Sequence, residues 1–118
     1  MSKPVGPEEA VRKFFDCYST GHPENFDQCV APDYLDYGHE PPGRGPDGAR
    51  DDYESAIKMV GGLIPYTIDA LVIDGETVAT SWTGALPNGK DLKGLSLFEV
   101  RDGMLRSTHH KLIGGLPV

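Results

Sequence analysis

Three dipeptides that favour tight turns divide the second half of the chain. They are Asp74-Gly75, Asn88-Gly89 and Asp102-Gly103. Each can supply the positive backbone φ angles that a two-residue hairpin loop requires. Apolar and polar residues alternate around these turns in four runs, at residues 66–73, 76–83, 91–100 and 104–113. A period of two is typical of strands with one buried face, so this half is predicted to form a four-stranded antiparallel meander.

Two segments of the first half carry apolar residues at helical spacing. The first begins at Pro7 and ends at Gly21, with an apolar face made of Val11, Phe14, Phe15 and Tyr18. The second begins near Asp47 and ends at Gly61, with an inward stripe made of Tyr53, Ala56, Ile57, Val60 and Leu63. Spacings of three and four residues place these side chains on one side of a helix, so both segments are predicted to be helices.

The segment between these helices is shorter and more irregular. A short helix is predicted at residues 23–30, because Pro23 suits a helix start and Pro32 ends the pattern. A short strand or extended segment is expected at residues 33–40, followed by a loop rich in proline and glycine. Residues 1–6 are expected to form a loose tail.

Length and charge limit the kinds of protein that this chain can be. Its 118 residues suit one domain spanning residues 1–118. A net charge of −7 makes nucleic acid an unlikely partner, because phosphate binding needs a basic surface. No apolar run is long enough to span a membrane, and the first residues lack the apolar core of a secretory signal. We therefore expect a cytoplasmic protein.

Helices followed by a meander are typical of an α+β architecture. A layer of three N-terminal helices would pack on one face of a curved antiparallel sheet. A sheet that wraps around a long helix leaves a cone with one open end, and a pocket there is the natural place for function.

Four stretches of the chain, in this order, resemble a known family. They are AVRKFFDCYSTGH, APDYLDYGHEPPGRGPDGAR, IDGETVATSWTG and GLSLFEVRDGMLRSTHH. Together they are similar to the SnoaL-like polyketide cyclase group of the nuclear transport factor two-like superfamily, whose members have a cystatin-like α+β cone fold. The resemblance implies a cofactor-free cyclase or isomerase, a small hydrophobic, polyketide-like substrate, and a homodimer formed through the uncovered face of the sheet.

The resemblance also suggests where the chemistry would lie. In the family's cyclases a carboxylate on the last strand acts as general acid and base, and that position matches Ser107 in this chain. A tryptophan two residues further matches His109, and a polar pocket residue on the preceding strand matches Lys93. A histidine of the family's DYxxH segment matches Tyr37, with His39 two positions later. The usual acid is therefore absent, and His109 is the predicted substitute.

The last strand carries His109 and His110 side by side, so one should face the pocket and the other should face away. Two registers are open for the final hairpin. A two-residue turn sets Glu99 opposite Arg106. A three-residue turn with a bulge sets Leu97 opposite Ser107 and Leu95 opposite His109. In either register Leu105, Ser107 and His109 share one face, which the family alignment places inside.

We therefore predict that His109 faces the pocket and transfers protons, and that His110 faces away from it.

Alternation over residues 35–39 places Tyr37 and His39 on one face, so that Tyr37 could donate a hydrogen bond to an enolate. Asp36, on the other face, is an alternative base. Solvent-exposed positions at the rim are the competing interpretation for this segment. The predicted substrate-binding residues are Phe14, Tyr18, Trp82, Leu95, Leu97 and Ser107, although core packing would explain the aromatic ones equally well.

Other chemistries find little support in the sequence. The histidines lack the spacing of metal ligands, and no phosphate-binding loop is present. Cys17 and Cys29 are expected to be buried free thiols.

Two further functions stay open. One is a non-catalytic binding or assembly module of the same fold. The other is an epoxide hydrolase, although the two acids and one arginine of that chemistry cannot be assembled from the sequence.

Overall fold

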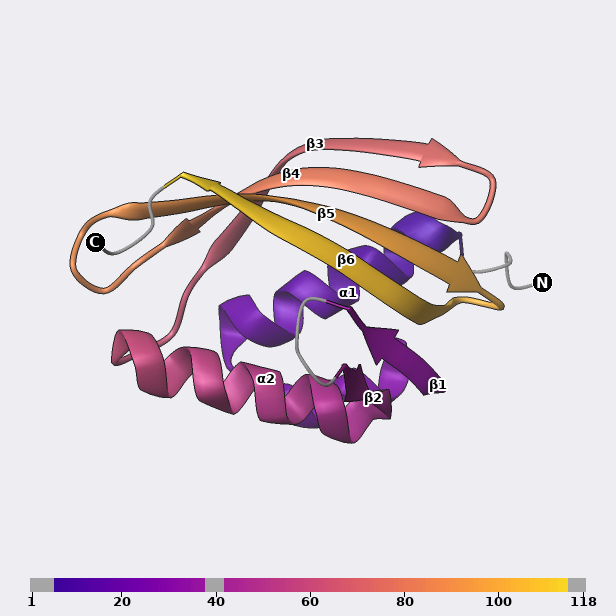
Figure 1. The fold of residues 1–118 in the computed structure, drawn as a ribbon, viewed down its shortest axis with the longest axis horizontal. Helices are drawn as coiled ribbons and strands as arrows, with labels where there is room; N and C mark the ends of the chain where they lie inside the picture. The colour runs from indigo at the N-terminus through magenta and orange to yellow at the C-terminus, as the bar shows by residue number, and fades with distance from the viewer. Residues whose placement is uncertain (1–5, 38–41, 115–118) are drawn as a thin grey trace.

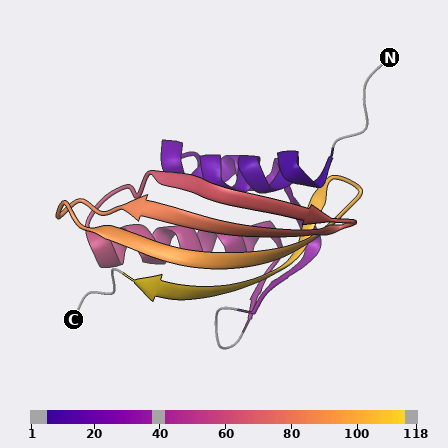
Figure 2. The same cartoon turned by 90° about the horizontal axis from the view of Figure 1, so that it is seen from above.

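The computed structural model describes residues 6–37 and 42–114. Its elements in chain order are α1 (Pro7–Thr20), the 3₁₀-helix η1 (Pro23–Gln28), β1 (Val30–Asp36), β2 (Gly43–Arg44), α2 (Gly45–Val60), β3 (Tyr66–Asp74), β4 (Thr77–Ala85), β5 (Asp91–Arg101) and β6 (Met104–Gly114). Figure 1 shows a curved sheet with both α-helices beneath it, and Figure 2 shows the same arrangement from above. The predicted α+β fold with a curved sheet is confirmed.

The sheet has six strands in the order β2-β1-β6-β5-β4-β3. Strands β3 to β6 pair antiparallel in sequence order, as the turn dipeptides predict. Strand β1 then adds to β6 in parallel, and β2 pairs with β1. The sheet is therefore mixed rather than wholly antiparallel. The parallel strand matters for function because it brings the end of β1 beside the middle of β6.

The two α-helices agree with their sequence signals. Helix α1 starts with Pro7 followed by two acids, and Gly21 ends it in the left-handed conformation with φ of 76°. The short helix predicted at residues 23–30 is present only in part. Residues Pro23–Gln28 form a 3₁₀-helix, and Val30 already belongs to β1. Phe26 is the only buried residue of this short segment, so no longer apolar stripe sustains an α-helix there.

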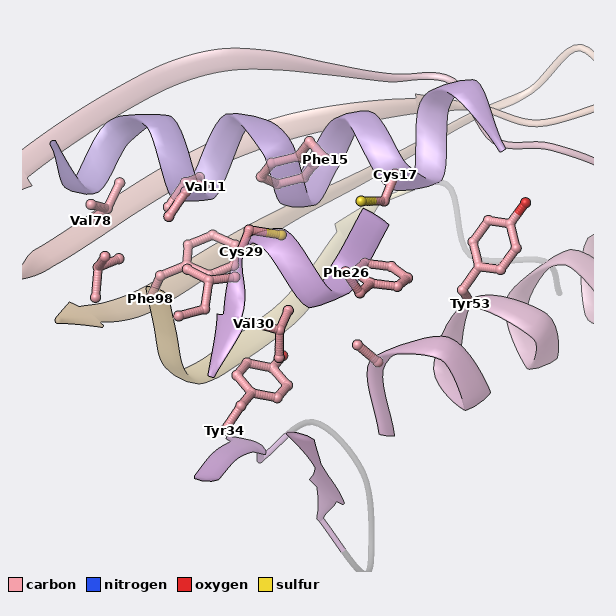
Figure 3. Packing of buried hydrophobic residues seen from close by; sticks show 14 of the residues in the cluster. Val11, Phe15, Cys17, Phe26, Cys29, Val30, Tyr34, Tyr53, Val78 and Phe98 are labelled. Atoms are coloured by element: carbon pink, nitrogen blue, oxygen red, sulfur yellow. The ribbon is translucent and has the colours of Figure 1, made fainter. Parts of the chain in front are cut away.

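The core lies between the helices and the concave face of the sheet. Figure 3 shows Val11 and Phe15 of α1 facing Phe26 of η1 and Phe98 of β5. The Tyr34 hydroxyl donates a buried hydrogen bond of 2.8 Å to Thr108 Oγ1, which ties β1 to β6. Cys17 and Cys29 are buried free thiols within this cluster, as the sequence predicts.

The β5–β6 hairpin has a tight turn and one extra residue. Asp102 and Gly103 both have positive φ, 54° and 75°, and Arg101 pairs directly with Met104. Val100 then pairs with Leu105, but Glu99 pairs with Ser107, so Arg106 is skipped. This is a β-bulge, and it shifts the alternation of side chains by one residue in the part of β6 that follows Arg106. Neither predicted register is right, because the turn has two residues and the bulge lies within the strand.

The bulge changes which side chains of β6 face the helices. Leu105 is fully buried, and beyond the bulge Thr108 is also buried, at 3% exposure. With Thr108 facing inward, alternation turns His110 and Leu112 inward as well, and both line a cavity. The predicted common face of Leu105, Ser107 and His109 is therefore wrong.

Candidate active site

A cavity of about 240 Å³ lies between the two α-helices and the concave side of the sheet. Most of its wall is aromatic or aliphatic. The apolar lining residues are Phe14, Phe15, Tyr18, Ala56, Met59, Tyr66, Trp82, Leu92 and Leu112. Five polar side chains interrupt this surface: Asp36, Asp52, Ser55, Ser96 and His110. An apolar cavity with a few convergent polar groups is the usual form of a small-molecule site.

Three of the polar side chains come together from three elements. Asp36 ends β1, Asp52 lies on α2 and His110 lies on β6. Because Asp36 pairs in parallel with Thr108, its side chain lies beside the strand position that leads to His110. The His110 Nδ1 atom is 3.8 Å from Asp36 Oδ1, and the side chains of Asp36 and Asp52 share a hydrogen bond. Asp36 is only 5% exposed.

The two carboxyl groups differ in their protonation. Burial, the hydrogen bond with Asp36 and the negative charge of Asp36 together raise the pKa of Asp52 from its ordinary 3.8 to about 8. Two carboxylates that share one site cannot both ionise cheaply, so one of them keeps a proton. At neutral pH Asp52 is therefore an acid that can donate a hydrogen bond.

Two tyrosine hydroxyls add further donors. Burial holds the pKa of Tyr18 well above its usual range, with the charge of Asp52 nearby as the next cause. Burial also raises the pKa of Tyr66 to about 12. Both hydroxyls therefore stay protonated at physiological pH. Neither one makes a hydrogen bond with a residue in the described part of the chain, so both are available to a ligand.

The structure puts some predicted site residues in the cavity. Phe14, Tyr18 and Trp82 line it, as does Asp36, the alternative base. The predicted orientation of the histidines is wrong, since His110 lines the cavity and His109 lies on the opposite face. There His109 stacks on Tyr37, with ring centroids 4.6 Å apart and an interplanar angle of 13°. The bulge at Arg106 is the cause.

Other predicted residues lie away from the cavity. Tyr37 is 49% exposed beside His109. Leu95 and Leu97 are also half exposed, because their neighbours Gly94 and Ser96 are the buried, inward positions of β5. Ser107 is buried but does not line the cavity. Lys93 is exposed at the rim of the sheet. His39 lies outside the described residues.

Sequence reasoning missed Asp52, His110 and Tyr66. Asp52 could have been found, because Asp52, Ala56 and Met59 fall at i, i+4 and i+7 on one helix face. Asp52, Ala56 and Met59 line the cavity, whereas Tyr53 and Ile57 of the predicted stripe pack in or against the core. His110 had no such signal, because its direction depends on one bulge that no sequence pattern indicates.

Among the described residues, no group of three or more His, Cys, Asp and Glu is arranged to hold a metal ion. No helix in the described ranges is long and apolar enough to cross a membrane.

The fold and the cavity define an α+β cone with an acidic, largely aromatic pocket, and comparison with known proteins gives its family. Residues 11–108 match the model of the SnoaL-like domain. The chain therefore belongs to the SnoaL-like family. Among curated protein sequences, none shows significant similarity to it.

Solved structures resemble the chain in fold. A proposed ketosteroid isomerase from Kribbella flavida is 20% identical with a TM-score of 0.76, covering 95% of this chain and 81% of that one. A proposed polyketide cyclase from Bacillus cereus is 24% identical with a TM-score of 0.75, covering 90% and 73%. IdmH, a proposed polyketide cyclase from Streptomyces antibioticus, is 20% identical with a TM-score of 0.73, covering 90% and 91%. At these identities the likeness establishes the cystatin-like fold alone.

Proposed function

We propose that the protein is a cofactor-independent cyclase or isomerase that transfers protons on a small, hydrophobic, enolisable carbonyl compound. One observation carries the proposal: a carboxylate and a protonated carboxyl group meet at the wall of an apolar cavity. Paired acids whose environments separate their pKa values are the usual basis for acid and base roles at one pH. The names of the similar structures, polyketide cyclase and ketosteroid isomerase, belong to the same kind of chemistry.

The residues take distinct roles in this reaction. The Asp36 carboxylate removes a proton from the carbon next to the substrate carbonyl, and the electron pair of that C–H bond moves into the enolate. Protonated Asp52 and the Tyr18 hydroxyl donate hydrogen bonds to the enolate oxygen, where the negative charge develops. Asp36 then returns the proton to another carbon, which completes an isomerisation. In a cyclase, the enolate carbon instead attacks a second carbonyl of the substrate, and the new alkoxide takes up the proton.

His110 is the third member of the site. Its ring nitrogen lies 3.8 Å from Asp36, so a small movement would bring the two side chains within hydrogen-bond distance. The aromatic walls lower the local polarity around the buried Asp36, so electrostatic interactions there are stronger than in bulk solvent. Within the described residues no arginine lines the cavity, which gives an epoxide hydrolase less support than proton transfer.

Deuterium exchange on a neutral bicyclic ketone such as 2-tetralone tests the proposal. Proton NMR would follow the loss of the signals next to the carbonyl in D₂O. We expect the D36N substitution to lower the enzymatic exchange rate by roughly 10²–10⁴-fold, the range typical of a general base. An unchanged rate in the D36N variant would contradict the proposal. Ketone binding without any exchange by the native protein would instead favour a binding module.

The adjacent histidines offer a matched pair of variants. H110A should lower the exchange rate, because it removes the group beside Asp36. H109A should leave the rate unchanged, because this ring lies on the other face of the sheet and stacks on Tyr37. Both changes remove one imidazole from the same strand, so they differ in position and not in chemistry. Equal effects of the two variants would refute the assignment of His110.

We also propose that two copies of the chain pair through the outer face of the sheet. Both α-helices lie on the other face (Figure 2), and Leu95 and Leu97 are 46% and 44% exposed on this one. A second copy of the same face would bury these leucines in an isologous interface. Light scattering should give the mass of a dimer for the native chain and of a monomer for the L97K variant. A monomeric native protein would exclude this interface.

A further inference from the structure

Three rings of the cavity meet almost at right angles. Tyr18 and Tyr66 have ring centroids 5.6 Å apart and an interplanar angle of 87°. Tyr66 and Trp82 are 5.1 Å apart at 81°. The rings come from α1, β3 and β4 and line one cavity. Such adjoining aromatic walls offer both faces and edges to a ligand, and aromatic faces attract cations.

The orientation of Trp82 is fixed by its neighbours. Its Nε1–H group donates a hydrogen bond of 2.8 Å to Ser96 Oγ. Its ring also lies against Gly94, where an added Cβ would be only 2.2 Å from Trp82 Cζ2. The indole N–H is therefore already satisfied. What Trp82 offers to the cavity is ring surface rather than a hydrogen-bond donor, which suits an ammonium group better than a carbonyl.

The charges at the cavity favour the same kind of ligand. Asp36, Asp52 and His110 are its ionisable polar lining groups, and the described lining includes no lysine or arginine. An anionic ligand would meet a carboxylate whose described basic neighbour in the lining is the imidazole of His110, with no lysine or arginine beside it. A cation would meet both the carboxyl pair and the electron-rich ring faces.

We propose that the cavity binds an organic cation, with a substituted ammonium group held among Tyr18, Tyr66 and Trp82 and facing the Asp36–Asp52 pair. This inference rests on the proposed function and narrows its substrate class to enolisable carbonyl compounds that carry a basic or quaternary nitrogen. Binding would use the positive charge for attraction. Where the cation ionises Asp52, the Tyr18 hydroxyl remains as the donor to the enolate oxygen and Asp36 as the base.

Binding of a cation should depend on pH in a defined direction. The described titratable groups near Asp52 come from three other elements: Asp36 and Tyr34 of β1, His110 of β6 and Tyr18 of α1. Asp51 lies beside it on α2. A nearby positive charge favours the ionised form of Asp52, so its binding releases a proton. Affinity for a cation should therefore rise as the pH passes the Asp52 pKa of about 8. A neutral ligand that accepts a hydrogen bond from protonated Asp52 should bind more weakly over the same range.

A pair of probes with the same shape separates charge from size. Choline and 3,3-dimethylbutan-1-ol differ only in a quaternary nitrogen replaced by carbon. Titration calorimetry or NMR at pH 6 and pH 9 should show choline binding more tightly than the alcohol, by roughly tenfold at pH 9, as expected for a desolvated cation–π contact with a carboxylate nearby. The advantage of choline should shrink at pH 6.

Variants locate the effect within the site. D52N should abolish the gain in choline affinity between pH 6 and pH 9, whereas E54Q, on the exposed face of the same helix, should keep it. Y18L should reduce choline binding more than alcohol binding, and it provides a second test if D52N does not fold. Equal binding of both probes by the native chain, or tighter binding of the alcohol, would overturn the inference. Exchange of a neutral ketone that depends on Asp36 would then still support the proposed function, so the two failures are distinguishable.

Discussion

The protonated Asp52 makes the stability of the fold depend on pH, and replacing this residue should reveal the dependence. Between its ordinary pKa of 3.8 and the folded value of about 8, the folded chain holds a proton at Asp52 that the unfolded chain has released. The free energy of unfolding therefore falls as the pH rises through this window. D52N removes the ionisable group, so its stability should not fall in this way. The variant should gain on the native chain as the pH increases.

The size of the gain follows from the pKa difference. About four pH units, at about 1.4 kcal/mol each, set an upper limit of roughly 6 kcal/mol. Asp52 is only partly buried, so water and small rearrangements would screen the charge and reduce this value. We expect D52N to be more stable than the native chain by about 2–3 kcal/mol at pH 9, relative to the difference between them at pH 5.

Urea unfolding of both proteins at several pH values from 5 to 9 measures this difference. E54Q is the control, because it removes one exposed carboxylate from the same helix and so reports the general effect of the net charge of −7. The difference between D52N and the native chain should grow from pH 5 and level off above the Asp52 pKa of about 8, while that of E54Q should stay nearly flat. Parallel stability curves for D52N and the native chain would refute the assignment of a raised pKa to Asp52.

Two further predictions concern packing. F26A should destabilise the fold by roughly 3–5 kcal/mol in chemical unfolding, because Phe26 is 0% exposed and anchors η1 in the core; a loss below about 1 kcal/mol would contradict that role. G94A should push Trp82 away from β5, because the added Cβ would be 2.2 Å from its ring. The emission of this single tryptophan should shift to longer wavelength, and an unchanged spectrum would show that the ring stays in place.

Local sequence signals predict much of the fold without any knowledge of tertiary contacts. Dipeptides such as Asp102-Gly103 predict the hairpins, since few other residues tolerate positive φ. The helical spacing around Phe15 predicts α1 in the same way. The parallel addition of β1 to β6 is different, because it joins segments about 70 residues apart and depends on the assembled core. The 3₁₀ form of η1 also escapes prediction, since composition does not separate it from a short α-helix.

The site could be predicted only where it shares the core pattern. Phe14, Tyr18 and Trp82 are apolar positions of regular elements, and alternation or helical spacing places them inside. Asp36 was predicted as an alternative base because it alternates with Tyr37. The direction of His110 depends on one skipped residue four positions earlier. No propensity marks that position, so strict alternation leads to the wrong histidine.

The bulge at Arg106 gives the register of β6 a chemical consequence. If the same residues paired without the bulge, Arg106 would lie opposite Glu99, and His109 and His110 would exchange faces of the sheet without any substitution. The cavity would still receive an imidazole, but the outer face would receive the other one and lose the stacked pair with Tyr37. Two relatives with the same residues at matching positions can therefore present different pockets. The presence or absence of a bulge in this strand can therefore change which side chain reaches the cavity, just as a point mutation can.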